Sequence, residues 1–290
     1  MDWLTSIKIP IGPWAKACVD WLTSNGRWLF DFLKVFLQAG IDAVLFILQG
    51  PFSGKAAEFG YALFMIVLIT GAAWYFRRSI GVAVFTFLGL LLIVNQGYWE
   101  ETTETLALVL AATGVSMVVG VPLGIAAARR PWFYAVLRPM LDLMQTIPTF
   151  VYLIPALILF GLGMVPGLIA TVIFAIPAPI RLTRLGIIST PPSLVEAAQA
   201  FGATPGQVLR KVELPFAMPQ IMAGLTQTIM LSLSMVVIAA LVGAKGLGVP
   251  VVRALNTVNI SMGFEAGLCI VILAIVLDRL FRSSDEGEGA

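Results

Sequence analysis

The sequence predicts an all-α membrane protein, a polytopic helical bundle of about seven transmembrane helices preceded by an amphipathic N-terminal helix. The chain has 290 residues, of which 59% are hydrophobic and only 12% are charged. A soluble domain carries roughly 25% charged residues, so water cannot be the solvent for most of this surface. Uncharged apolar runs also recur, and about 18 such residues suffice to cross a bilayer core as a helix.

Seven apolar segments qualify as candidate spans. They are Phe59–Phe76, Ile80–Gly97, Thr105–Ala128, Leu143–Met164, Gly167–Ile180, Ile221–Gly243 and Ala266–Phe281. The fifth is short and contains Pro177 and Pro179, which have no backbone N–H to donate. The seventh has few uncharged residues between Glu265 and Asp278, so its ends must snorkel or tilt.

The distribution of Lys and Arg predicts the orientation, because these residues accumulate in cytoplasmic loops. If the N-terminus is outside, one side receives Arg77, Arg78, Arg129, Arg130, Arg138, Arg181, Arg184, Arg210, Lys211, Arg279 and Arg282. The opposite side receives Lys245 and Arg253 in its loops, plus the cations of the N-terminal tail. We therefore expect a multi-pass protein with its N-terminus outside, its C-terminus in the cytoplasm and the 181–215 loop in the cytoplasm.

The tail before the first span contains an amphipathic segment, Trp28–Gln49. Its polar residues recur every three or four positions and form one stripe along a helix. Such a helix favours the membrane interface, with Trp28, Phe32 and Phe36 toward lipid. An eighth span over the same residues is the alternative.

Small residues recur at intervals of four in the third span, at Ser116, Gly120, Gly124 and Ala128. Small side chains on one helix face let a second helix approach closely. Both a subunit interface and ordinary packing within one bundle explain this stripe.

Two consecutive helix-start signals lie in the 181–215 loop. Ser193 and Glu196 have the spacing of a capping box, and Thr204 and Gln207 repeat it. Pro205 occupies the favoured first helical position after the second signal.

Stop signals complete this loop. Gly202 lies between the two predicted helices, where a left-handed helix end needs a residue without a Cβ atom. Pro215 is expected to end the second helix. A short helix, a glycine turn and a second short helix would form a rigid knob suited to docking a partner, although a well-capped connecting loop has the same signals.

The residues of this loop carry a resemblance. It matches the signature of permease subunits in binding-protein-dependent ABC importers at Glu196, Ala197, Ala198, Gly202, Val212, Leu214 and Pro215. The one departure is Val212, at a position that is usually Ile. In that family the loop is a coupling helix that sits in a groove of the ATP-hydrolysing subunit, so the resemblance implies that these seven residues couple the chain to an ATPase.

A narrower resemblance covers Glu100 to Phe281. The stretches Leu141–Pro155, Pro177–Thr183 and Leu231–Ala239 are similar to permeases that import glycine betaine, proline betaine or choline. The resemblance implies a type I ABC importer permease core over residues 100–282, with its coupling loop at 186–215. The tail (1–57) and two peripheral helices (58–99) would precede this core, and an acidic tail (283–290) would follow it.

No catalytic machinery is evident. The chain has no His, and its two cysteines lie far apart, so no metal site follows. The net charge of +2 does not favour nucleic acid as a partner. The segment Gly50–Ala56 is a broken phosphate-binding loop, with three residues between its glycines and Ala where a Ser or Thr should hold magnesium. We therefore expect no enzyme activity and no cofactor in this chain, with ATP and magnesium bound by a separate ATPase.

Polar residues, a proline that breaks the helix and two aromatic residues inside two spans mark the candidate pathway. They are Gln145, Thr146, Pro148, Thr149, Phe150 and Tyr152 in the fourth span, and Gln227, Ser232 and Ser234 on an expected polar side of the sixth. Polar or broken helices at membrane depth are tolerated where they line a cavity or are buried in protein. The aromatic rings could face a quaternary ammonium group, while packing between helices explains the same residues equally well.

Ionisable groups inside spans would indicate an ion-driven carrier. Asp142, Arg181, Glu265 and Asp278 are all expected near span ends, which favours energy supplied through the loop instead.

The function predicted is therefore the permease subunit of an importer for choline, glycine betaine or proline betaine in a bacterial plasma (inner) membrane. The resemblance implies four partners: a second copy of the chain, cytoplasmic ATPase subunits, an extracytoplasmic substrate-binding protein and the lipid bilayer. The alternatives are a similar permease for an amino acid or a sulfonate, and an ATP-independent channel or facilitator.

Overall fold

Helices form almost the whole of the computed structural model, which describes residues 10–50 and 55–281. The N-terminal and peripheral helices are α2 (Ile11–Asn25), α3 (Arg27–Gln49), α4 (Lys55–Arg77) and α5 (Ile80–Asn95). The first half of the core contains α6 (Trp99–Arg129), α7 (Pro131–Thr146), α8 (Thr149–Phe160), α9 (Met164–Ala175) and α10 (Pro177–Ile188). The rest comprises α11 (Pro192–Ala200), α12 (Pro205–Val208), the π-helix η1 (Leu209–Glu213), α13 (Leu214–Ala240), α14 (Gly248–Thr257) and α15 (Ile260–Phe281). The predicted all-α class is confirmed.

Each predicted span corresponds to helical structure. Within the described part of the chain, five helices are long and apolar enough to cross a membrane: Phe59–Arg77, Trp99–Arg129, Met164–Ile188, Pro205–Ala240 and Ile260–Phe281. The bent pair α7 and α8 supplies a sixth candidate, and α5 is a shorter apolar helix. The fold is therefore a polytopic membrane bundle.

The fourth span is wrong as a single helix over Leu143–Met164. The helix α7 ends at Thr146, and α8 runs at 96° to it. Pro148 causes the break, because a proline disfavours helical backbone at the preceding residue, and Ile147 is extended with ψ of 130°. The first half of this bent span is therefore α7, Pro131–Thr146, where Arg138 and Asp142 interrupt the apolar sequence.

The core is built where α6, α10 and α13 pack closely through small residues. A Cβ atom on Gly120 would lie 2.8 Å from the Pro179 side chain, and one on Gly124 would lie 2.7 Å from Thr183. These contacts join α6 to α10 within one chain. The small-residue stripe of the third span is therefore intrachain packing, which the sequence left open against a subunit interface.

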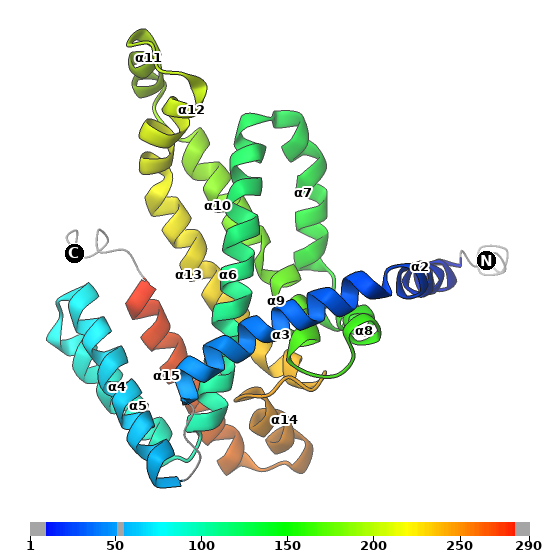
Figure 1. The fold of residues 1–290 in the computed structure, drawn as a ribbon, viewed down its shortest axis with the longest axis vertical. Coiled ribbons are helices and arrows are strands. Elements are labelled where there is room, and N and C mark those ends of the chain that lie inside the picture. Colours follow the sequence, from blue (N-terminus) through cyan, green and yellow to red (C-terminus); the bar gives the residue numbers. More distant parts are fainter. Residues whose placement is uncertain (1–9, 51–54, 282–290) are drawn as a thin grey trace, which may run out of the picture.

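The amphipathic helix α3 crosses the bundle instead of running along it (Figure 1). Ile41 and Leu48 are buried against the core, while Trp28, Phe32 and Phe36 remain exposed. The helix has 23 residues, but it is not among the helices that qualify as membrane spans by length and composition together. Its position in the membrane interface stays a prediction.

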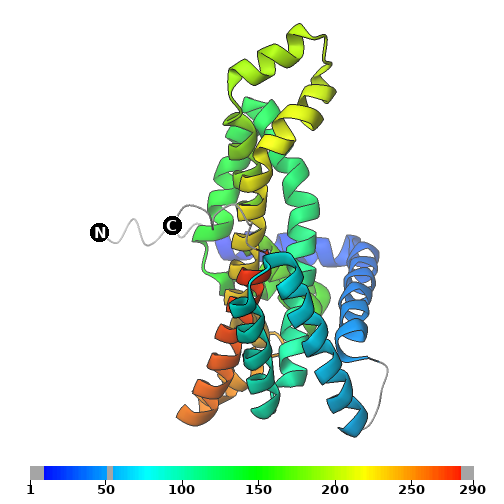
Figure 2. The same cartoon turned by 90° about the vertical axis from the view of Figure 1, so that its left-hand side faces the viewer.

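The two ends of the molecule differ in chemistry. A knob formed by α11 and α12 projects at the upper end in Figures 1 and 2, and α14 lies at the lower end in Figure 1. The helices α4, α6 and α15 all end toward the knob, with Arg77, Arg129 and Arg279 in their last turns. Basic residues therefore gather on the side of the knob. Arg282, the acidic tail at 283–290 and most of the broken phosphate-loop segment (51–54) lie outside the described residues.

Candidate functional site: the coupling knob and the helices it joins

The knob turns at Gly202, as the sequence predicted. Its φ is +81°, in the left-handed region that favours glycine. The N–H of Ala203 donates to the Ala198 carbonyl at 3.0 Å, and the N–H of Gly202 donates to the Gln199 carbonyl at 2.9 Å. This pair of bonds is a Schellman motif, which satisfies carbonyls at the end of α11 and fixes the direction of the exit chain.

The second capping box forms as predicted. The Thr204 side chain accepts from the Gln207 N–H at 3.4 Å, and the Gln207 side chain accepts from the Thr204 N–H at 2.8 Å. Pro205 follows as the first residue of α12. Both turns of the knob are therefore fixed by hydrogen bonds between residues a few positions apart in the chain.

Two details of the predicted loop are wrong. No capping box forms at Ser193 and Glu196, because α11 already begins at Pro192 with Pro191 in the cap position. Pro215 does not end the second helix, which continues through η1 into α13 as far as Ala240. Pro215 directly follows Leu214, whose N–H closes the wider π turn onto the Leu209 carbonyl. This turn shifts the register of the backbone hydrogen bonds and accommodates a residue that has no N–H. The knob is thus continuous with a membrane helix.

The signature residues fall into two groups. Glu196, Ala197 and Gly202 are exposed and Ala198 is partly buried at the tip, while Val212 and Leu214 are partly buried and Pro215 is exposed at the base. Between the two helices, the Phe201 side chain is 93% exposed. Sequence reasoning missed Phe201, although an aromatic residue directly before a turn glycine, in a loop expected in the cytoplasm, was an available signal. The tip therefore exposes both an apolar ring and the Glu196 carboxylate, as a docking surface would.

The predicted pathway residues of the fourth span surround the α7–α8 break. Thr146, Pro148 and Phe150 are exposed, and Thr149 and Tyr152 are partly buried. The break places these side chains between two helix directions instead of along one helix face. Their contact with a transported solute stays a prediction.

The polar residues of α13 do not share one face. Gln227 and Ser234 are both exposed and lie seven residues apart, which puts them on the same side of a helix. Ser232 is fully buried, about 140° around the helix from Gln227. The expected polar side of the sixth span is therefore wrong for Ser232, which packs inside the bundle, while Gln227 and Ser234 face outward.

Charged residues lie inside the fifth span, contrary to expectation. This span runs to Ile188 and so includes Arg181, whose guanidinium donates to Asp142 at 2.5 Å and to Gln145 at 3.2 Å on α7. Arg184 lies over the Tyr134 ring, 3.7 Å from its centroid. The partners of Arg181 on α7 let the helix continue past that charge, as paired charges in membrane segments do.

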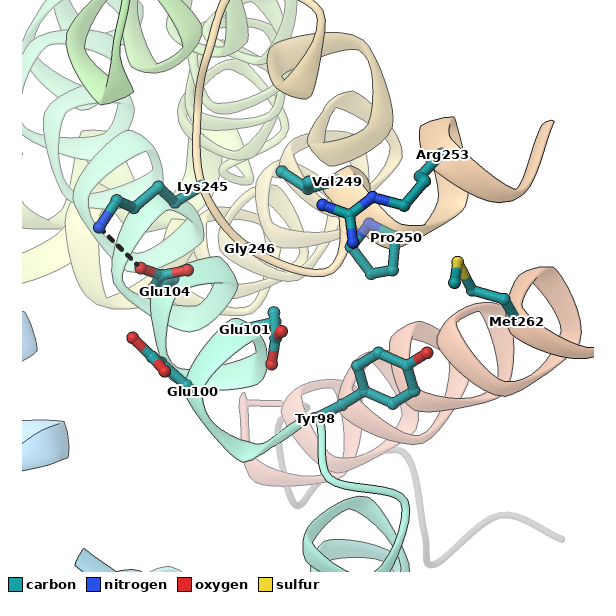
Figure 3. A pocket seen from close by; sticks show the side chains of 10 residues that line it. All are labelled: Tyr98, Glu100, Glu101, Glu104, Lys245, Gly246, Val249, Pro250, Arg253 and Met262. Atoms are coloured by element: carbon teal, nitrogen blue, oxygen red, sulfur yellow. Dashed lines mark ion pairs between the residues drawn. The ribbon is translucent and has the colours of Figure 1, made fainter. Parts of the chain in front are cut away.

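The end opposite the knob carries a charged pocket of about 310 Å³ (Figure 3). Glu100, Glu101 and Glu104 line one side, with the ion pair of Glu104 and Lys245 at 3.6 Å, and Arg253 reaches over the opposite side. Burial and the Glu265 carboxylate raise the pKa of the Tyr98 phenol. The Thr105 hydroxyl accepts from the Leu247 N–H at 2.8 Å and anchors the loop before α14.

A multi-pass helical bundle with a rigid helix–turn–helix knob at its basic end, continuous with a core span, is the architecture of a transporter's membrane subunit. Residues 120–287 match the family model described as "binding-protein-dependent transport system inner membrane component". The chain belongs to this family of ABC importer permease subunits, which are not themselves enzymes. It is accordingly a polytopic inner-membrane protein, and the sequence resemblance is confirmed.

Curated relatives cover nearly the whole chain. The glycine betaine transport system permease protein OpuAB of Bacillus subtilis (strain 168) is 44% identical over 95% of this chain and 94% of its own length. The glycine betaine/carnitine transport permease protein GbuB of Listeria monocytogenes serotype 1/2a (strain 10403S) is 45% identical, with 95% of each chain covered. The glycine betaine/proline betaine permease protein ProW of Escherichia coli (strain K12) is 44% identical over 97% of this chain and 82% of its own.

Solved structures agree on the fold. Inward-facing structures of the MetNI methionine ABC transporter contain a chain that is 26% identical, with a TM-score of 0.56, over 62% of this chain and 92% of that one. A second crystal form gives a TM-score of 0.58 at 25% identity. The matched part is a type I ABC importer permease.

Proposed function

We propose that this chain forms the translocation pathway of an ATP-driven importer for small quaternary ammonium solutes such as choline, glycine betaine or proline betaine. The observation that carries the proposal is the 44% identity to a glycine betaine permease along 95% of this chain and 94% of that one. Identity of this extent includes the spans as well as the coupling knob. It therefore favours a shared class of transported solute over a shared transporter architecture with a different solute.

A separate ATPase supplies the energy in this proposal. The ATPase binds ATP and magnesium, and this chain binds no cofactor. Its knob docks on that partner through Glu196, Ala197 and the exposed Phe201 ring. Two features support the coupling role: the turns at Gly202 and Thr204 make the knob rigid, and the continuous helix from Pro205 to Ala240 leads from it into the bundle.

Two copies of the chain enclose the pathway. One copy leaves Gln227 and Ser234 of α13 outward-facing and Phe150 exposed next to the α7–α8 break. Polar groups at membrane depth are costly against lipid, so a second copy opposite them would provide a wet, protein-lined space. The Phe150 ring offers a π-face for a quaternary ammonium group.

The orientation follows from the basic end of the bundle. The knob, Arg129 and the C-terminus lie in the cytoplasm and the N-terminus lies outside, as the rule for basic residues requires. The charged pocket near Glu101 and Arg253 then faces outward. A polar, mixed-charge rim of this kind suits a substrate-binding protein that must dock and release repeatedly.

Uptake tests the proposal. Cells without their own carriers would express the chain together with the ATPase and binding-protein genes, and a matched strain would lack only this chain. Accumulation of labelled glycine betaine or choline that requires both the chain and ATP supports the proposal. If the complex assembles but imports neither solute, the quaternary ammonium cargo is wrong, and uptake of a labelled amino acid or sulfonate would identify the cargo class instead.

A further inference from the structure

One arginine at the end of α6 reaches into the base of the knob. The Arg129 guanidinium lies 2.6 Å from Glu213 Oε2 and 3.3 Å from the Pro205 carbonyl oxygen. Pro205 begins α12 and Glu213 ends η1. A single side chain therefore ties both ends of this helical segment to a core helix that lies more than 70 residues earlier in the chain.

The π turn explains why Glu213 meets Arg129. The N–H of Leu214 donates to the Leu209 carbonyl, five residues back. This wider turn contains an extra residue, which changes the angular positions of its own side chains around the helix axis. The Glu213 side chain is only 13% exposed, whereas the neighbouring Arg210 and Lys211 are exposed. The π turn thus directs the carboxylate inward while the two adjacent cations face solvent.

Apolar contacts place the two groups against each other. Leu209 and Leu214 pack on the cluster around Ile187 and Ala217, and Ile125 and Ala128 of α6 pack on the same cluster. Ala128 directly precedes Arg129 and Leu214 directly follows Glu213, so packing on one shared cluster brings the two charged residues together. Both bonds come from one terminal guanidinium nitrogen, whose two N–H groups donate to the carboxylate and to the carbonyl. A lysine would keep the charge but would replace these fixed planar donors with a rotatable ammonium on a different stem.

We propose that Arg129 is a positioning residue that transmits movement of the knob to α6, so that the ATPase drives two core helices instead of one. The covalent path leads from the knob into α13, and the Arg129–Glu213 contact adds a path into α6. Because α6 packs closely on α10 at Gly120 and Gly124, the second path leads directly into the packed pair of α6 and α10. The inference rests on the coupling role proposed above for the knob.

The test measures solute transported per ATP hydrolysed by the complete complex, reconstituted with the binding protein. Arg129→Gln and Glu213→Gln should each lower this ratio about five-fold or more, which is the lower range of typical coupling energies. The double exchange Arg129→Glu with Glu213→Arg should give a higher ratio than Arg129→Glu alone or Glu213→Arg alone. Arg129→Lys should give an intermediate value. Arg130→Gln is the matched control, because it removes an adjacent, exposed arginine and should keep the ratio within about two-fold.

Assembly is measured in parallel, so that loss of the complex is not counted as loss of coupling. If Arg129→Gln fails to assemble, the double exchange decides: an assembled exchange variant without a recovered ratio overturns the inference. The inference is also wrong if Arg129→Gln assembles and keeps the wild-type ratio while Gly202→Val loses it. If Gly202→Val keeps the ratio as well, the coupling role of the knob itself fails.

Discussion

The turn of the knob offers the sharpest test of the coupling role, through Gly202→Val. No atom lies within 4 Å of a Cβ built on Gly202, so the substitution causes no clash, and its whole cost comes from the backbone. A left-handed conformation costs an L-residue about 1–2 kcal/mol, and a β-branched side chain is at the high end. A cost of about 2 kcal/mol lowers the equilibrium constant between the native turn of the knob and other loop conformations by roughly 30-fold.

Gly206→Val is the matched control. Gly206 lies four residues later, in α12, and a Cβ there also has no neighbour within 4 Å, but its φ is not positive. Val should be tolerated in this helical position, because glycine is the poorer helix former. In the reconstituted complex, Gly202→Val should lower transport per ATP by about 5- to 30-fold, while Gly206→Val should leave it near wild type. An assembled Gly202→Val complex with normal coupling would refute the reasoning.

Other predictions concern the caps and the core. Thr204→Ala should destabilise the knob by about 1 kcal/mol and speed amide hydrogen exchange after the turn, whereas Ser193→Ala should leave exchange unchanged because Ser193 caps nothing; equal effects would contradict the observed start of α11. Gly124→Ala should destabilise the bundle by about 1–3 kcal/mol, because its Cβ would lie 2.8 Å from a backbone oxygen of α10. Thermal unfolding in detergent measures this loss, with Gly114→Ala, which meets no neighbour, as the control; equal melting temperatures would contradict the α6–α10 contact.

Local chemistry made much of the site predictable. The turn at Gly202 and the cap at Thr204 depend on residues a few positions away, and both form as expected. The end of the second helix was not predictable in the same way. Pro215 is a strong stop signal in isolation, but the π turn directly before it lets the helix continue.

Long-range contacts account for what the sequence did not reveal. The fifth span passes Arg181 because Asp142 and Gln145, more than 35 positions earlier, satisfy its guanidinium. A hydropathy profile registers Arg181 only as a charge that interrupts an apolar segment. The pair of Arg129 and Glu213 is separated by 84 positions, so no periodicity could have joined them. The burial of Ser232 likewise depends on which helices surround α13.

Solute accumulation in proteoliposomes tests the central claim most directly. The complex of this chain and its ATPase would be reconstituted with ATP in the lumen, and binding protein and labelled glycine betaine would be supplied outside. The account predicts that the labelled solute rises above its external concentration only with luminal ATP and with binding protein present. Equilibration to the external concentration without ATP would contradict it and indicate a channel or facilitator.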